Sequence, residues 1–324
     1  MDSGQEILRK HFKQVKLVAD PEELLEEVSD AHAIVTRLKA IDHELIESAS
    51  LLKIIVRHGV GTDKIDIASA TEHGVLVAYT PESLSTSVAE YTVGTIISLL
   101  RLIREADRSV RSGNWNARQH ELIGTELSGK TIGIVGLGRI GSEVAKRLNS
   151  FETNLIYYDL VRQPQREKKL TIKYFSLNSL LKRSDIVCLH VPATADTMHM
   201  IGENELASMR PAALLINMSR GSVIEEKALV DALSTNRLRG AALDVFDPEP
   251  PLLTNPLLQL SNVLLSPHMS GHTKEALSRT SVEVADAVIA GLSGKRPRHL
   301  SNPEVLTRPT KPQRKTNSSC DCTL

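Results

Sequence analysis

A glycine-rich turn within residues 130–141 constrains the fold more than any other part of the sequence. An apolar run at 132–135 has the composition of a buried parallel strand, and an amphipathic segment follows the turn. Between them, Gly136, Gly138 and Gly141 have the spacing G-x-G-x-x-G. Glycines at this spacing allow a tight turn from strand to helix and let backbone N–H groups approach a pyrophosphate at the helix N-terminus. The pattern therefore predicts a dinucleotide-binding βαβ unit.

An acidic residue completes this unit. A second apolar run, at 155–158, ends in Asp159, about where a βαβ unit places the side chain that binds the adenosine ribose. A carboxylate accepts hydrogen bonds from the ribose hydroxyls and repels a 2′-phosphate, so Asp159 favours NAD over NADP. Arg162 is the opposing signal, because a guanidinium at this point could bind the phosphate. We expect Asp159 to dominate and NAD to be the cofactor.

Strand-like and helix-like patterns alternate along the chain, which is typical of an α/β fold with parallel sheets. Three apolar runs precede a long helical stretch at about 87–111, six follow it, and a last amphipathic helix is expected at about 274–292. The expected strands are 33–35, 54–56, 75–78, 132–135, 155–158, 186–190, 214–217, 241–245 and 263–266, and further helical segments are expected at 21–28, 204–209 and 227–233.

The same patterns divide the chain into two domains. We expect residues 1–86 and 274–303 to form one domain, completed by the returning helix, and residues 87–273 to form the other. The cleft between two such domains is the natural ligand site. The segment 304–324 is rich in Pro, Lys, Thr and Ser, and we expect it to be disordered.

Composition excludes several classes of partner. The chain carries 39 basic and 39 acidic residues, so nucleic acid and anionic membranes are poor candidates. No apolar run reaches the roughly 18 residues of a membrane span. Cys188, Cys320 and Cys322 are too few and too badly placed for a disulfide framework, and no Cys–His spacing indicates a metal site. A reducing, cytoplasmic setting is the simplest interpretation.

Three polar segments directly follow expected strands, and each carries one candidate catalytic side chain. These side chains are Arg220, Glu249 and His268. In a doubly wound sheet the loops beyond the carboxyl ends of the strands border the ligand crevice, so the three are expected to converge there. Each could instead be a solvated loop residue, but three such side chains in equivalent positions beside a nicotinamide site favour a catalytic group.

At this point the chain resembles a known family. The motifs G-L-G-R-I-G, H-V-P-A-T-A-D-T, N-M-S-R-G, D-V-F-D-P-E-P and S-P-H-M-S-G are similar to the signature set of the D-isomer-specific 2-hydroxyacid dehydrogenases, over roughly residues 4–303. The resemblance implies a Rossmann NAD-binding domain inserted in a flavodoxin-like substrate domain, both with doubly wound parallel sheets. It also implies hydride transfer between NAD(H) and a small anionic acid of the 3-phosphoglycerate, glycerate/hydroxypyruvate or glyoxylate class. A dinucleotide-sensing scaffold or corepressor of the same fold is the alternative.

The resemblance assigns a role to each candidate catalytic residue. Arg220 would clamp the 2-oxo acid and polarise its carbonyl. His268 would exchange the substrate hydroxyl proton, since imidazole titrates near neutral pH and can serve both directions. Glu249 would orient His268 and stabilise its imidazolium, and it argues against the formate-oxidising members, which carry an amide there.

The resemblance also implies two sets of binding residues. Backbone N–H groups near His58, Gly59 and Val60 would hold the substrate carboxylate, with Arg57 adding positive charge. Besides the three glycines, the expected cofactor contacts are Arg139, Ile140, Asp159, Val191, Pro192, Thr197, Met218, Ser219, Asp244, His268 and Gly271.

Further expectations concern assembly and the first domain. Similar proteins form homodimers around the long helix and the following loop, where Trp115 contributes either to an interface or to the core. His190 ends a strand and is expected to be a satisfied edge residue rather than a catalyst. Family members usually begin with a short apolar strand before the segment matched by residues 4–8. Here that strand is missing, so we expect uncovered sheet edges and apolar helix faces in the first domain.

Overall fold

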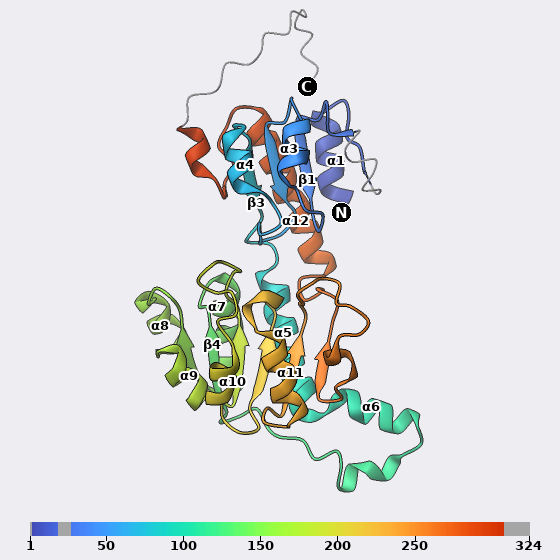
Figure 1. Cartoon of the computed structure of the whole chain (residues 1–324), viewed down its shortest axis with the longest axis vertical. Helices are drawn as coiled ribbons and strands as arrows, with labels where there is room; N and C mark the ends of the chain where they lie inside the picture. The colour runs from blue at the N-terminus through green and yellow to red at the C-terminus, as the bar shows by residue number, and fades with distance from the viewer. Residues whose placement is uncertain (1, 19–26, 308–324) are drawn as a thin grey trace, which may run out of the picture. The chain divides into compact units, whose positions relative to one another are not determined.

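The computed structural model describes residues 2–18 and 27–307 of the chain. It divides into two compact units (Figure 1). Unit 1 comprises Met1–Leu84 and Thr273–Leu324, and unit 2 comprises Ser85–His272. The two boundaries expected between the domains, 86/87 and 273/274, differ from this division by at most two residues.

Unit 2 is built on a sheet of seven parallel strands in the order β10-β9-β8-β7-β4-β5-β6. The chain enters at β4, adds β5 and β6 on one side, and then adds the others from β7 outward. The crevice outside the carboxyl ends of β4 and β7 is therefore the switch point at which such sheets bind ligands. The strands are β4 (Thr131–Val135), β5 (Asn154–Tyr158), β6 (Lys173–Tyr174), β7 (Ile186–Leu189), β8 (Leu214–Asn217), β9 (Gly240–Leu243) and β10 (Val263–Leu265).

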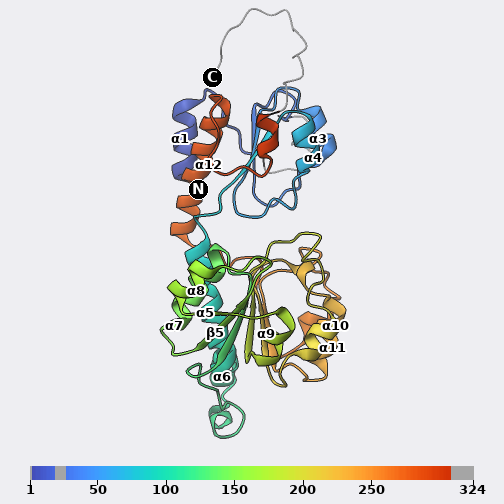
Figure 2. The same ribbon diagram turned by 90° about the vertical axis from the view of Figure 1, so that its left-hand side faces the viewer.

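Helices cover both faces of this sheet (Figure 2). Helices α5 and α7 pack together on one face, whereas α9, α10 and α11 lie on the other. Buried side chains such as Leu189 and Leu215 form the core beneath the second group. The helices are α5 (Ser85–Arg101), α6 (Ile103–Arg111), α7 (Arg139–Asn149), α8 (Pro164–Leu170), α9 (Leu177–Arg183), α10 (Glu203–Ser208) and α11 (Glu226–Ser234).

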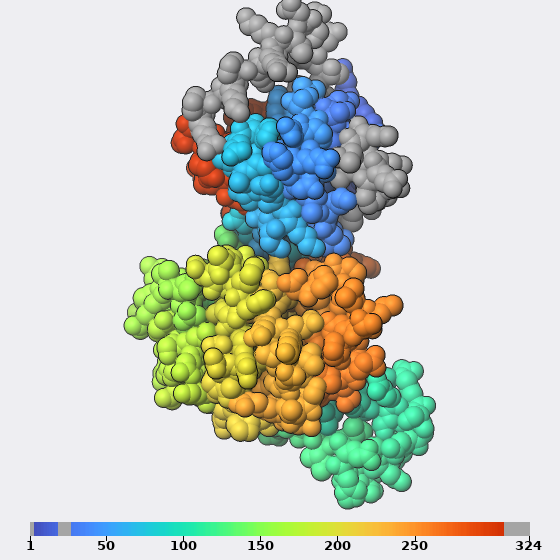
Figure 3. Space-filling view, viewed as in Figure 1, coloured from blue at the N-terminus to red at the C-terminus, as the bar shows by residue number. Residues whose placement is uncertain are grey.

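The single helix expected at 87–111 is wrong, because the structure has two helices there. Leu102 adopts a left-handed backbone with φ of 54°, which ends α5, and α6 sets off at an angle of 59° to it. No residue of α6 is buried, and the segment that follows it stands out from the body of unit 2 (Figure 3). In the described part of the chain no single helix is long and apolar enough to cross a membrane. Helices α5 and α6 reach that length and apolar composition only when they are counted together, and they are bent at their junction.

Unit 1 has a sheet of three parallel strands in the order β1-β2-β3 among its described residues. Helices α1 and α12 cover one face and α3 and α4 lie on the other (Figure 2). Leu8 of α1 and Val288 of α12 are buried together with Ile54 of the central strand, so the apolar helix faces have partners. The elements are α1 (Asp2–His11), β1 (Ala33–Thr36), α3 (His43–Ser48), β2 (Ile54–Arg57), α4 (Ile67–Glu72), β3 (Leu76–Tyr79) and α12 (Lys274–Leu292).

The expectation of uncovered edges is wrong at β3. Leu300 forms an antiparallel bridge with Ala78, and Ser301 N donates to Val77 O over 2.8 Å. The side chain of Asn302 accepts from Val77 N over 2.8 Å and is completely buried. The returning chain thus closes the edge with both backbone and side-chain hydrogen bonds.

These bonds also correct the start of the expected disordered tail. Residues Pro303–Leu306 form a short 3-10 helix directly after the anchored Asn302. The expected disorder is therefore wrong for residues 304–307, and the segment 308–324, with the cysteines at its end, lies outside the described residues. The helix expected at 21–28 also falls almost wholly outside them.

Candidate active site

The glycine turn between β4 and α7 has the form that a dinucleotide requires. Gly136 has φ of 94°, and a Cβ there would lie 2.8 Å from the carbonyl carbon of His190. A Cβ on Gly141 would lie 2.1 Å from Gly136 O, so this close packing of helix against strand admits only glycine. Around Gly138 the space is open, which leaves room for a pyrophosphate to approach the backbone at the start of α7. The turn therefore fits the expected cofactor.

Asp159 lies at the carboxyl end of β5 and is tied to this turn. Its Oδ2 accepts a hydrogen bond of 2.8 Å from Leu137 N, between the first two glycines. The other carboxylate oxygen makes no hydrogen bond with the residues that the structure describes. One oxygen thus fixes the turn, and the second is available to accept from a ribose hydroxyl.

The segment after β7 borders the same turn. Thr197 is buried, and its hydroxyl donates to Pro192 O over 2.6 Å while accepting from Thr194 N over 2.8 Å. These bonds fix the loop that the sequence assigns to cofactor binding. Val191, at its start, is also buried.

His190 corrects a sequence prediction. It was expected to be a satisfied edge residue, but neither ring nitrogen has a hydrogen-bond partner among the described residues. Burial lowers the pKa of His190 to about 4, because the charged imidazolium cannot be solvated there. The ring is therefore neutral near neutral pH.

The turn after β8 is organised by Asn217, which the sequence analysis missed as a functional residue. Its Oδ1 accepts from both the backbone N and the hydroxyl of Ser219, and its Nδ2 donates to Arg220 O over 2.8 Å. An asparagine that hydrogen-bonds the backbone two residues on is a known turn former, and its place directly after a strand was the available signal. The Ser219 hydroxyl is used inside this turn, and Met218 is buried beside it.

Arg220 leaves this turn with its guanidinium donating to Ser219 O over 2.6 Å. The next residue, Gly221, packs so tightly on the loop after β9 that a Cβ would lie 2.1 Å from the carbonyl carbon of Phe246. The segment that carries Arg220 is therefore in direct contact with the segment that leads to Glu249.

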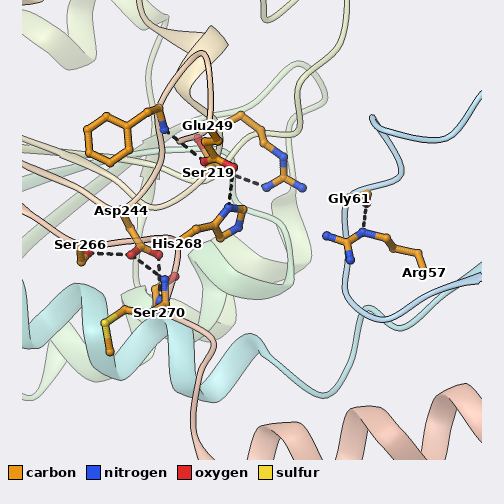
Figure 4. A network of polar contacts seen from close by, with 11 residues as sticks. Arg57, Gly61, Ser219, Asp244, Glu249, Ser266, His268 and Ser270 are labelled. Carbon is orange, nitrogen blue, oxygen red and sulfur yellow. Dashed lines mark hydrogen bonds and ion pairs between the residues drawn. The ribbon is translucent and has the colours of Figure 1, made fainter. Parts of the chain in front are cut away.

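Glu249 and His268 form a hydrogen-bonded pair (Figure 4). His268 Nδ1 and Glu249 Oε2 are 3.0 Å apart, and Glu249 Oε1 accepts from Phe246 N over 3.2 Å. An ionised carboxylate can only accept, so Nδ1 carries the proton and Nε2 is the nitrogen left to exchange a proton with a ligand. The side chain of His268 is 34% exposed and that of Glu249 19%, so the pair is reachable yet largely shielded.

Asp244 is hydrogen-bonded to the loop that carries His268. Its side chain is completely buried, and its carboxylate accepts from Ser266 Oγ (2.6 Å), Met269 N (2.8 Å) and Ser270 N (2.8 Å) (Figure 4). The expected contact between this carboxylate and the cofactor stays a prediction, because a carboxylate can accept more than three hydrogen bonds. The bonds within the protein hold the loop in which His268 sits with φ of 50°, a left-handed backbone that is costly for a residue with a side chain.

The expected substrate loop of unit 1 also needs correction. The N–H groups of His58 and Gly59 are already used: the first donates to Thr36 O, and the second donates to Thr80 Oγ1, each over 2.8 Å. Of the three expected anion donors, Val60 N alone has no partner among the described residues. The loop follows the parallel strand β2, and its first two backbone N–H groups form hydrogen bonds with neighbouring residues of the same unit. They are therefore not available to an anion.

The side chains of this loop are occupied as well. Arg57 donates from Nε to Gly61 O over 2.8 Å (Figure 4). It also donates from Nη1 to His58 O over 3.1 Å. Burial lowers the pKa of His58 to about 4, and its Nε2 has no hydrogen-bond partner among the described residues. His58 is thus a neutral ring, and Arg57 shapes the loop with its guanidinium.

Other potential chemistry is limited. Within residues 2–18 and 27–307 no group of three or more His, Cys, Asp or Glu side chains could hold a metal ion. Cys188 is a buried free thiol whose pKa burial raises to about 12, so it stays protonated.

Comparison with known proteins identifies the family. Residues 93–270 match the model of the D-isomer specific 2-hydroxyacid dehydrogenase NAD binding domain. The chain is also 45% identical over 289 residues to the glyoxylate reductase of Thermofilum pendens, an overlap that covers 88% of this chain and 85% of that protein. The chain belongs to the D-isomer specific 2-hydroxyacid dehydrogenase family.

Further relatives of this dehydrogenase carry related activities in their names. A D-3-phosphoglycerate dehydrogenase of Archaeoglobus fulgidus is 39% identical over 277 residues, which are 85% of this chain and 52% of that longer protein. The solved D-lactate dehydrogenase of Aquifex aeolicus, complexed with NAD and lactic acid, superposes with a TM-score of 0.80 at 31% identity and covers 90% of this chain and 91% of that one.

The family assignment confirms the predicted fold class, enzyme class and cofactor. The protein is an NAD-dependent D-2-hydroxyacid dehydrogenase, an oxidoreductase that acts on the CH–OH group of its substrate. The relatives named above are reductases and dehydrogenases, so the alternative of a dinucleotide-sensing scaffold is not favoured. The individual contacts with cofactor and substrate stay predictions.

Proposed function

We propose that this dehydrogenase interconverts a small 2-oxo acid and the corresponding D-2-hydroxy acid, with Arg220, Glu249 and His268 as its catalytic residues. The observation that carries the proposal is the hydrogen bond of 3.0 Å between His268 and Glu249. An imidazole oriented by a carboxylate suits a group that must both give and take a proton. The close contact between the Arg220 turn and the loop leading to Glu249 supports a shared site.

Each residue then has a distinct task. When bound, NADH supplies the hydride that C2 of the 2-oxo acid accepts. Arg220 binds the substrate carboxylate with its planar guanidinium and polarises the neighbouring carbonyl. His268 Nε2 donates a proton to the carbonyl oxygen during reduction and takes it back during oxidation, while Glu249 keeps the ring in the required tautomer. The glycine turn and Asp159 would hold the pyrophosphate and the adenosine ribose.

The substrate belongs to the glyoxylate or hydroxypyruvate class rather than the 3-phosphoglycerate class. A phosphorylated substrate needs a second cation, and Arg57 carries the positive charge that the sequence analysis expected near the substrate. Its guanidinium donates instead to carbonyl oxygens of its own loop, and the neutral His58 ring adds no charge. This arrangement supports a short substrate without a second anionic group.

Oxidation of NADH by the purified enzyme tests this assignment. We expect kcat/KM for glyoxylate or hydroxypyruvate to exceed that for 3-phosphohydroxypyruvate by about tenfold or more. A preference for the phosphorylated acid would contradict the substrate class. No turnover with any of the three acids, at saturating NADH, would contradict the proposed function.

Arg220→Ala is expected to lower kcat/KM by on the order of 100-fold, because the variant loses a charge-assisted contact with the substrate carboxylate and the polarisation of its carbonyl. The affinity for NADH, measured by fluorescence titration, should change by less than about twofold. An equal fall in cofactor affinity would show that Arg220 acts on the cofactor or the fold instead.

The proposal includes a cytoplasmic homodimer. Apolar side chains stand exposed along α6 and the loop after it, among them Val110 (58%), Trp115 (61%) and Ile123 (68%), and a second copy would cover them. Trp115 is therefore a candidate for the interface rather than the core. The free Cys188 thiol is in keeping with a reducing compartment.

Light scattering at micromolar concentration is expected to give twice the 35.6 kDa mass of the chain. Trp115→Asp should shift the population toward the monomer, because it places a charge in the apolar surface that the partner covers. A stable wild-type monomer would contradict the dimer and leave the catalytic proposal intact.

A further inference from the structure

An acidic side chain holds Arg162, the residue whose charge opposed the NAD preference in the sequence. Glu167 Oε1 accepts from Arg162 Nε over 2.8 Å, and Glu167 Oε2 accepts from Arg162 Nη2 over 2.9 Å. The two parallel bonds form the bidentate geometry that fits a guanidinium best. The guanidinium carbon also lies 5.8 Å from the centre of the Tyr174 ring on β6. The guanidinium of Arg162 is thus held along one edge by Glu167 and over one face by the ring of Tyr174.

Glu167 is itself fixed by a buried phenol. Tyr157, on β5, is fully buried, and its hydroxyl donates to Glu167 Oε1 over 2.7 Å while accepting from Gln163 N over 2.8 Å. The bonds from Arg162 and Tyr157 lower the pKa of Glu167 to about 2, so the carboxylate stays ionised across neutral pH. Burial and the bond to Glu167 raise the pKa of Tyr157 to about 12, so the phenol keeps its proton and remains a donor.

Arg166, the second arginine of this segment, is also bonded within the protein. Arg166 Nη1 donates to Leu137 O in the glycine turn, on the same residue whose N–H binds Asp159. Both guanidinium groups that follow Asp159 in sequence therefore have partners within the protein. While both arginines are bonded in this way, residues 160–167 offer no free cation that could attract a phosphate beside the anionic Asp159.

We propose that Glu167 is a specificity-determining residue for the cofactor: it holds Arg162 in an ion pair and so denies a 2′-phosphate the cation that it would need. A ribose hydroxyl requires an acceptor, which Asp159 supplies, whereas the 2′-phosphate of NADPH requires a donor with positive charge. The inference rests on NAD binding alone and is independent of the proposed substrate and of the catalytic residues.

Binding titrations with NADH and NADPH test the proposal without turnover. We expect Glu167→Gln to increase the affinity for NADPH relative to NADH by about tenfold, because the freed guanidinium can form charge-assisted hydrogen bonds with the phosphate. In the double variant Glu167→Gln/Arg162→Ala the gain should disappear. Asp107→Asn, which breaks the exposed Asp107–Arg111 pair on α6, is the matched control and should leave the ratio unchanged.

The double-variant cycle also identifies the outcomes that would overturn the proposal. A ratio unchanged by Glu167→Gln would overturn it, and so would a gain that persists without Arg162, since that gain would come only from removing a negative charge. Arg162→Ala alone gives a second, safe measurement because the side chain is 62% exposed. We expect it to change the NADPH affinity by less than about twofold, whereas a tenfold loss would show that Arg162 already serves the phosphate.

Discussion

His268→Ala is expected to lower turnover by on the order of 100-fold or more, the scale of a lost general acid–base. The structure leaves Nε2 of this ring to exchange a proton, because Nδ1 is bonded to Glu249. Alanine offers no replacement donor at that point. Steady-state rates of NADH oxidation with the best 2-oxo acid, measured between pH 5 and 9, give the comparison.

His199→Ala is a matched control for this variant. His199 lies in the same unit, is exposed and has the same left-handed φ of 50°, so the control also removes an imidazole from a strained backbone position. Its turnover should stay close to wild type. Near-normal turnover of His268→Ala across the whole pH range would refute the assignment of His268 as the acid–base.

Glu249→Gln tests the other half of the pair while preserving the shape of the side chain. The neutral amide no longer stabilises an imidazolium, so the reductive pH profile should shift to lower pH. The melting temperature should change little, because the bond from Phe246 N to the side-chain oxygen can be kept. An unmoved profile would mean that Glu249 does not act through His268.

Asp244→Ala is expected to reduce kcat strongly while leaving the NADH affinity within about threefold. The completely buried carboxylate accepts three hydrogen bonds from the loop that carries His268. Without it the donors are buried and unsatisfied, at a cost of about 2–4 kcal/mol, and the left-handed His268 backbone can relax. A cost of that size should lower the melting temperature by roughly 5–10 °C.

Asp185→Ala is a control that separates the effect of Asp244 on the position of His268 from its effect on stability. Asp185 also accepts from a backbone N–H, that of Thr131 at the start of β4, over 2.9 Å. Because this bond lies at the amino end of the strands, its loss should lower the melting temperature without an equal loss of kcat. If Asp244→Ala instead weakened NADH binding and spared the melting temperature, Asp244 would be a cofactor contact, as the sequence first suggested.

The sequence predicted most of the fold because buried parallel strands are apolar on both faces. The runs around Ile54, Ile132 and Val187 have no polar alternation, and each became a strand. β6 was missed because Lys173–Tyr174 is only two residues long and has no apolar run. The break at Leu102 was missed because leucine favours helix, and its left-handed conformation has no signal in the local sequence.

For the candidate site, the sequence predicted the catalytic residue types but not the hydrogen bonds within the protein. The residue types of Arg220, Glu249 and His268 follow from the chemistry of a 2-oxo acid, and their segments lie at the carboxyl ends of adjacent strands β8, β9 and β10. The sequence does not show where hydrogen bonds inside the protein have already been made. Gly59 was therefore assigned to the substrate although its N–H already donates to Thr80, and the sequence did not show that Asp244 also bonds the His268 loop.

The placement of unit 2 as an insertion within unit 1 has a consequence on the ribosome. Helix α12, which covers β2, and residues 299–302, which close the β3 edge, are synthesised only after all of unit 2. At about 5–20 residues per second the interval is roughly 10–40 s. During that time the first part of unit 1 has its strands but lacks the helix that buries Ile54 and Val56. The nascent chain therefore exposes the apolar face of the unit 1 sheet to chaperones, while unit 2, which is synthesised before α12, can already fold.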